Sequence, residues 1–143
     1  MDFSPAKIIN SVAFKTFGAD KLFQYELLHD YAPKTTWLQT MDEIDQFLTQ
    51  FAEDDMLVLK PRRGSSGQGV IVCRKSNYDP ELIDTHRLAQ RGYLGQEFLD
   101  TSAGIPGITQ QTHDLRIITM IDTIVLCHVR TPPSGSLIGN THT

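Results

Sequence analysis

The sequence predicts an α+β fold, in which antiparallel strands pack against helices. Segments with helical spacing of apolar residues alternate with short β-branched apolar segments along the 143 residues. One pair of short segments flanks a glycine-rich loop and reads as antiparallel, and the run at residues 115–130 reads as a hairpin. The length suits one domain with its own core, or two small lobes that share one.

The first helix is expected over residues 20–31, where apolar side chains recur at roughly helical spacing: Leu22, Phe23, Leu27 and Leu28. It ends before Pro33, which disfavours helix at Ala32. A second helix is expected after Thr40, because Thr40 and Glu43 match the capping-box pattern. Apolar residues then follow at i, i+3, i+4 and i+7: Ile44, Phe47, Leu48 and Phe51. One face of this helix should therefore pack on a sheet.

Strands are expected at residues 56–60 and 70–73, on the two sides of the glycine-rich loop. A third helix is expected to start at Pro80, with Asp79 as its N-cap. It should continue as one element until Gly92.

The second half of the chain is expected to be mainly extended. Residues 93–99 read as a strand and residues 101–112 as a loop with glycine and proline. Strands 115–121 and 124–130 should form the hairpin, with its turn at Asp122 and Thr123.

Composition and charge exclude several classes of protein. A net charge of -4 argues against broad nucleic-acid binding, so any basic site must be local. No stretch approaches the roughly 20 apolar residues of a membrane span, and the amino-terminal residues lack a secretory pattern. Cys73 and Cys127 lack metal-ligand or redox spacing, which favours buried free thiols and a cytoplasmic location. The five histidines show no zinc-ligand spacing, and Trp37 is expected in the core.

The loop in LVLKPRRGSSGQGVIVC (residues 57–73) matches none of three common phosphate-binding loops. A P-loop has Lys and Ser or Thr directly after its last glycine, where a helix begins, but here Val70 and a strand follow Gly69. The dinucleotide fingerprint also opens a helix. The protein-kinase loop joins antiparallel strands, yet its lysine lies on a later strand, whereas Lys60 precedes this loop. The pattern therefore indicates a different kind of anion-covering loop, one that connects two strands.

The residues of this loop suit an anion such as a polyphosphate. Glycines let backbone N–H groups wrap an anion closely, and serines add hydroxyl donors. Lys60 would supply a fixed positive charge, and Arg62 and Arg63 would raise the local potential. The alternative is a mobile hairpin loop whose glycines only relieve turn strain.

Five pieces of the sequence occur in the order of a known family: ADKLFQYELLHDYAPKTTWL, LVLKPRRGSSGQGVIV, QEFLD, HDLRIITMIDTIVLCHVRTPP and GSLIGNTH. From about Ala19 onward the chain resembles an ATP-grasp domain of the carboxylate–amine ligase kind. The pattern is most similar to the group that includes ribosomal S6 glutamate ligases and glutathione-synthetase-like enzymes. The resemblance implies two small lobes around a nucleotide cleft, residues 1–92 and an incomplete second lobe at residues 93–143.

The resemblance also implies roles for particular residues. The two lysines that contact the nucleotide phosphates match Lys21 and Lys60. The flexible cover over the phosphates matches Gly64, Ser65, Ser66, Gly67, Gln68 and Gly69. The segment between the lobes, where backbone groups meet the adenine edge, matches Gln96, Glu97, Phe98 and Leu99. A pair near the ribose and the substrate matches Asp114 and Arg116, and catalytic polar positions match Arg116, Arg130 and Asn140.

Each assignment has an alternative that the residues alone leave open. Lys21 is equally consistent with a solvated helix residue, and Glu97 with a solvent-facing strand residue. Asp114 and Arg116 are two apart on one strand face, where a surface ion pair would have little energetic value. Arg130 is also consistent with the last charge of an exposed edge strand.

The resemblance implies that ATP phosphorylates a carboxylate and that an amine then attacks the acyl phosphate. The expected partners are ATP, a small-molecule or peptide carboxylate, and Mg²⁺ with ligands beyond Thr143. The chain is therefore expected to be the ATP-binding part of a longer ligase and inactive alone. A non-catalytic nucleotide-binding module and a domain that binds no nucleotide remain alternatives.

Overall fold

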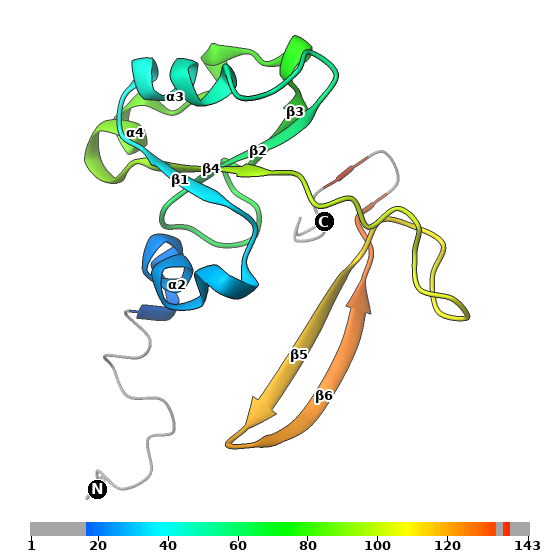
Figure 1. Ribbon diagram of the computed structural model, residues 1–143. Coiled ribbons are helices and arrows are strands. Elements are labelled where there is room, and N and C mark those ends of the chain that lie inside the picture. The colour runs from blue at the N-terminus through cyan, green and yellow to red at the C-terminus, as the bar shows by residue number, and fades with distance from the viewer. Residues whose placement is uncertain (1–16, 134–135, 138–143) are drawn as a thin grey trace, which may run out of the picture.

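The computed structural model describes residues 17–133 and 136–137 (Figure 1). The elements, in chain order, are α2 (Lys21–Leu28), η2 (His29–Tyr31), β1 (Thr35–Leu38), α3 (Met41–Leu48), β2 (Met56–Pro61), β3 (Ile71–Arg74), η3 (Lys75–Asn77), η4 (Pro80–Leu82), α4 (Thr85–Arg91), β4 (Tyr93–Glu97), β5 (Asp114–Met120) and β6 (Thr123–Arg130). Helices combined with antiparallel sheets confirm the α+β class. Within the described ranges, every helix is too short or too polar to cross a membrane.

A four-stranded antiparallel sheet carries the core, in the order β1-β4-β2-β3. β4 lies between β1 and β2, and Gly95 is opposite Thr36 on one side and Leu59 on the other. The strand is buried from Tyr93 to Gln96. Figure 1 shows α3 and α4 on one side of the sheet, and α2 with the loop after β2 on the other.

Helix α3 packs on the sheet through the face that its apolar spacing predicts. The capping box between Thr40 and Glu43 is present. Buried side chains from α3, α4, the sheet and the link between η4 and α4 form one cluster: Leu38, Ile44, Phe47, Leu48, Leu57, Leu59, Ile71, Ile83, Leu88 and Tyr93. Gly95 permits the close approach of helix and sheet, because a Cβ atom there would lie 2.7 Å from two ring atoms of Phe47.

The expected single helix after Asp79 is two elements. Asp79 caps the short η4 helix, with Pro80 in its first turn. The chain then turns extended at Ile83, whose side chain is buried in the core, and Asp84 caps α4 by accepting from the backbone N–H of Arg87. Burial of Ile83 therefore interrupts the helix. Gly92 ends α4 as predicted.

The β5–β6 hairpin forms as predicted, but its turn lies one residue earlier. Met120 pairs with Thr123, so the turn residues are Ile121 and Asp122. Ile121 is 97% exposed and has a φ of 58°, a left-handed conformation that β-branched residues rarely adopt. A register shift between Ile118 and Thr119 accompanies the turn.

Two expectations about burial are wrong. Cys127 is an exposed free thiol and Cys73 is only half-buried, because β6 belongs to a two-stranded sheet and β3 is an edge strand. Trp37 is 40% exposed, on edge strand β1, and the guanidinium carbon of Arg62 lies 5.2 Å from its ring centroid.

The division of the chain into lobes at residues 92 and 93 stays a prediction. Strand β4 belongs to the same sheet as β1 and β2, so that sheet extends to Glu97. The hairpin forms a separate sheet and points away from the first (Figure 1).

Candidate functional site

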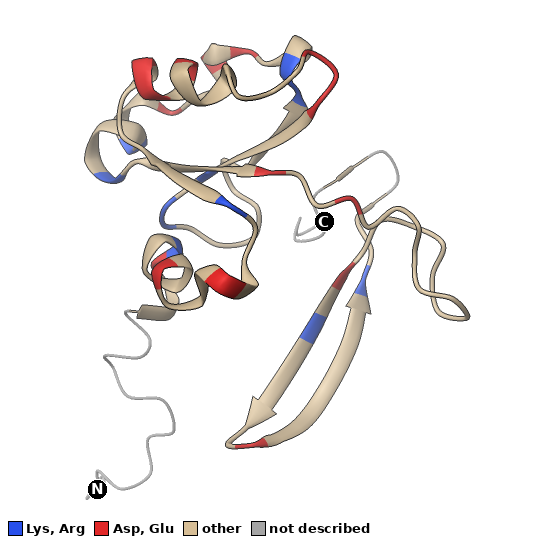
Figure 2. Ribbon diagram, in the orientation of Figure 1, with Lys and Arg blue, Asp and Glu red and all other residues tan. Residues whose placement is uncertain are grey.

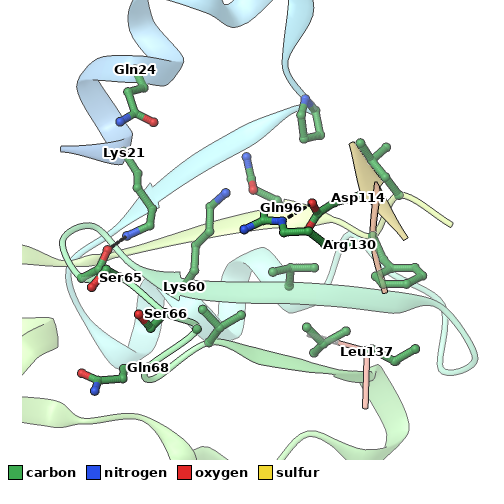
Figure 3. A pocket seen from close by; sticks show the side chains of 18 of the residues that line it. Lys21, Gln24, Lys60, Ser65, Ser66, Gln68, Gln96, Asp114, Arg130 and Leu137 are labelled. Carbon is green, nitrogen blue, oxygen red and sulfur yellow. Dashed lines mark hydrogen bonds and ion pairs between the residues drawn. The ribbon is translucent and has the colours of Figure 1, made fainter. Parts of the chain in front are cut away.

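A cleft of about 1180 Å³ opens between β2, the glycine-rich loop, the start of α2 and the base of the hairpin (Figure 3). Small-molecule sites commonly have volumes of roughly 300–1,000 Å³, so a nucleotide would fit. Among the residues that line it are most of the predicted site residues: Lys21, Lys60, Gly64, Ser65, Ser66, Gly67, Gln68, Gln96, Glu97, Phe98, Leu99, Asp114, Arg116 and Arg130. Gly69 is not among the lining residues, and Asn140 lies outside the described residues.

Lys21 connects the first helix to the loop. It is the first residue of α2, and its ammonium group donates to the carbonyl oxygens of Pro61 at 3.2 Å and Gly64 at 2.9 Å. Figure 3 shows the side chain directed at the loop. Lys21 is therefore a half-buried residue of the cleft. Burial lowers the pKa of its ammonium group, and the negative charge of Asp20 raises that pKa by a smaller amount.

Lys60 enters the same cleft from the sheet. Residues of β2 alternate in burial, with Leu57 and Leu59 in the core and Val58 and Lys60 on the cleft side. Burial lowers the pKa of Lys60, and the nearby positive charge of Lys21 lowers it further. An anion between the two ammonium groups would offset both effects, because an opposite charge favours the charged form of a lysine.

The loop between the strands presents backbone donors to this cleft. In the described part of the chain, the N–H groups of Ser65, Ser66 and Gly67 donate to no protein group. Ser66 has a φ of 56° and Gly67 of 73°, so the loop passes through two successive residues in the left-handed region. Gly69 is needed for packing as well as for its φ of 73°, because a Cβ atom would lie 3.0 Å from the Pro61 ring.

The remaining lining residues come from the strand after α4 and from the hairpin base. Gln96 is buried and its side-chain amide donates to the Thr35 hydroxyl, so it is held at the cleft floor. Asp114 and Arg130 face each other as the first pair of the hairpin, with Oδ1 and Nε 2.6 Å apart. The partner of Asp114 is thus across the strands, not Arg116 two residues along its own strand.

Figure 2 shows Lys and Arg on the loop after β2 and at the base of the hairpin, whereas several acidic residues lie on α3 across the sheet. The chain carries a net charge of -4, whereas the cleft is lined by four basic residues (Lys21, Lys60, Arg116 and Arg130) and two acidic ones (Glu97 and Asp114). This distribution suits a small anionic ligand.

Comparison with known families matches the ATP-grasp domain of prokaryotic glutathione synthetase to residues 20–143. The chain belongs to this ATP-grasp family. A curated relative, a probable alpha-L-glutamate ligase of Desulfotalea psychrophila, is 28% identical over 137 residues, covering 93% of this chain and 27% of the relative. The chain therefore spans about a quarter of that relative's length.

Membership confirms the resemblance read from the sequence motifs. ATP-grasp domains bind ATP, and the matched range of this ATP-grasp domain contains the cleft lysines, the glycine-rich loop and the hairpin. The individual roles of the cleft residues stay predictions.

The sequence analysis did not identify Asp20, and its expectation that Arg62 and Arg63 act at the anion site is wrong. Asp20 is 5% exposed, caps α2, and binds Arg62 through Nη2 at 2.8 Å and Arg63 at 3.4 Å. The Arg62 hydrogen bond is the main cause that lowers the pKa of Asp20 to about 2. The two arginines therefore neutralise a carboxylate and do not line the cleft. An Asp directly before Lys21 at a helix start was the only available signal.

A metal centre is not evident in the described ranges, where no three His, Cys, Asp or Glu side chains are grouped to hold an ion. The described residues that fit a nucleotide are the cationic and amide donors, which suit its phosphates.

Proposed function

We propose that this chain is the ATP-binding portion of an ATP-dependent ligase that joins a carboxylate to an amine through an acyl phosphate. The observation that carries the proposal is the pair of half-buried lysines, Lys21 and Lys60, in one cleft beside a loop with unpaired amides. Family membership and the ligase name of the relative support the reaction class.

In this proposal the chain binds and neutralises the triphosphate. Lys21 exchanges its bonds to the loop carbonyls for bonds to phosphate oxygens, and Lys60 adds a second charge from the sheet. The amides of Ser65, Ser66 and Gly67 complete the cradle. Magnesium would supply further neutralisation of phosphate charge, with ligands outside the described residues. Fixed donors of this kind stabilise the charge that develops during phosphoryl transfer.

The other lining residues are proposed to hold the nucleoside and the acid. Backbone groups of residues 96–99 would meet the adenine edge, and Asp114 the ribose. Arg116 and Arg130 would steady the acyl phosphate, because a guanidinium binds phosphate or carboxylate oxygens with two donors. Asn140 is proposed for the same reaction centre.

The chemistry balances without a covalent enzyme intermediate. A carboxylate oxygen attacks the γ-phosphorus, and ADP leaves with the bridging oxygen and its electrons. The amine nitrogen then attacks the acyl carbon, loses a proton and expels inorganic phosphate. The chain's share is to orient ATP and offset its charge.

The first test is calorimetric titration of ADP, with and without Mg²⁺, into the wild-type chain and Lys60→Ala. Loss of one charge-assisted contact should weaken ADP binding by roughly 10- to 100-fold. Lys34→Ala is the matched control, because Lys34 is exposed and does not line the cleft. A folded wild-type chain that binds no ADP, repeated with a longer chain, would contradict the proposal. ATP-dependent amide formation by the longer chain tests the ligase step.

A further inference from the structure

We propose that Asp20 is a positioning residue that holds Lys21 and the base of the glycine-rich loop in one arrangement for binding nucleotide phosphates. The inference rests on the proposed function, since it needs a ligand whose phosphates meet both elements. Asp20 with Arg62 and Arg63 is called the Asp20 clasp below.

The carboxylate of Asp20 joins two segments 42 residues apart. Its Oδ1 accepts from the backbone N–H groups of Leu22 at 3.2 Å and Phe23 at 3.4 Å, so it sets the start of α2. The same oxygen accepts from Arg62 Nε at 2.8 Å, and Oδ2 accepts from Nη2 of Arg62 at 2.8 Å. Two parallel bonds to a guanidinium fix direction as well as distance.

Main-chain contacts support the same junction. The N–H of Lys21 donates to the carbonyl of Arg62 at 3.1 Å, and Asp20 forms an isolated antiparallel bridge with Arg63. Lys21 donates through its ammonium group to the carbonyls on either side of the arginines, those of Pro61 and Gly64. The clasp is therefore in direct main-chain contact with Lys21, the lysine that faces the cleft.

Arg62 is held from a second direction. Its guanidinium lies over Trp37, and its backbone N–H donates to the carbonyl of Gly92 at 3.2 Å, at the end of α4. The base of the loop is thereby tied to β1 and to the junction of α4 and β4. The clasp connects α2 to the rigid sheet, while residues 65–67 remain available to a ligand.

The negative charge of Asp20 lets an experiment distinguish a positioning role from a purely electrostatic effect on phosphate binding. A carboxylate beside a phosphate site opposes phosphate binding, and Asp20 is next in sequence to Lys21. If only charge mattered, its removal would free two arginines and tighten phosphate binding. If Asp20 acts by position, the same change weakens binding, because Lys21 and the loop lose their common anchor.

The test is Asp20→Asn, since asparagine keeps the N-cap acceptor and removes the charge. We expect ADP with Mg²⁺ to bind about tenfold more weakly in calorimetry, while adenosine, which lacks phosphates, keeps its affinity. Unchanged or tighter ADP binding overturns the proposal. Asp79→Asn is the matched control, because Asp79 caps η4 without lining the cleft, and its ADP affinity should equal that of the wild type.

A second variant tests whether the clasp acts as one unit. Arg62→Gln should weaken ADP binding as Asp20→Asn does, and the double variant should be no weaker than either single one. The double variant removes the main ion pair as a unit and leaves only the more exposed Arg63 without the carboxylate, so it serves if Asp20→Asn fails to fold. Additive losses in the double variant contradict the clasp.

Amide hydrogen exchange keeps the clasp testable without a ligand. In Asp20→Asn, β4 should keep its protection while the hydrogen-bonded amides of the two joined segments exchange faster: Lys21, Gln24, Arg62, Gln68 and Val70. If the wild type binds no ADP, the proposed function fails, and unchanged exchange in the variant then overturns the clasp separately.

Discussion

At the scale of single residues, the cleft depends on two lysines whose surroundings disfavour their charge. Lys60 projects from the cleft side of β2, and Lys21 lies against the carbonyls of the loop base. Burial lowers the pKa of both ammonium groups. A phosphate ligand would favour the charged form of both ammonium groups, so ligand binding and protonation are linked at these positions.

This linkage predicts that ADP binding weakens as the pH rises toward the ordinary lysine pKa of about 10.4. The ligand-free lysines lose their protons at lower pH than an exposed lysine, and each lost charge costs affinity. The dissociation constant should rise by at most about tenfold per pH unit for each titrating lysine. The free energy of unfolding of the ligand-free chain should rise with pH over the same window. The reason is that the two lysines keep their protons to a higher pH in the unfolded chain than in the folded one.

Calorimetric ADP titrations between pH 7 and 10 measure the effect. Lys60→Arg is the control, because its guanidinium stays charged and should leave only the contribution of Lys21. A wild-type affinity that is flat up to pH 10 would show that neither ammonium group contacts the ligand.

At the scale of elements, the fit of α3 against β4 sets the position of the sheet that carries Lys60. β4 hydrogen-bonds to β2 in register, with Lys60 opposite Leu94. Helix α3 reaches β4 closely because Gly95 has no side chain beneath the Phe47 ring. Dense packing of this kind leaves little room for relaxation.

Gly95→Ala should lower the free energy of unfolding by about 1–3 kcal/mol, since the added methyl group overlaps the Phe47 ring. Denaturant unfolding followed by circular dichroism measures it. Gly18→Ala is the control, because nothing lies within 4 Å of a Cβ atom at Gly18. The cost should shrink when Phe47→Leu is already present, and an equal cost in both backgrounds would show that the ring is not the cause.

At the scale of the whole molecule, the described chain has a cored sheet and a hairpin without a comparable core. Most of the large hydrophobic side chains of the hairpin are exposed: Leu115, Ile117, Ile118, Met120, Ile121, Ile124, Val125 and Leu126. A two-stranded sheet is marginally stable without further cover. The cleft thus lies between parts that differ in local stability.

Native-state hydrogen exchange should reveal that difference. Amides of β2 and β4 should exchange most slowly, because they lie in the middle of the four-stranded sheet and beside the buried cluster. Amides of β5 and β6 should exchange at least roughly tenfold faster. Edge strands β1 and β3 should lie between these limits. Equal protection in the hairpin and in β4 would contradict this division of stability.

The sequence was sufficient for features that depend on close neighbours. The capping box of α3, the strands around the glycine-rich loop and the hairpin follow from residue types a few positions apart. The ordered family motifs also placed Lys21, Lys60 and the loop together, and the cleft contains them.

Other features depend on segments that meet only in the folded chain. Arg62 and Asp20 are 42 residues apart, and Lys21 reaches the carbonyl of Pro61 over a separation of 40 residues. The break at Ile83 and the partner of Asp114 were likewise set by burial and by strand register. Local sequence propensity cannot predict such partners, because packing and charge neutralisation between distant segments determine them.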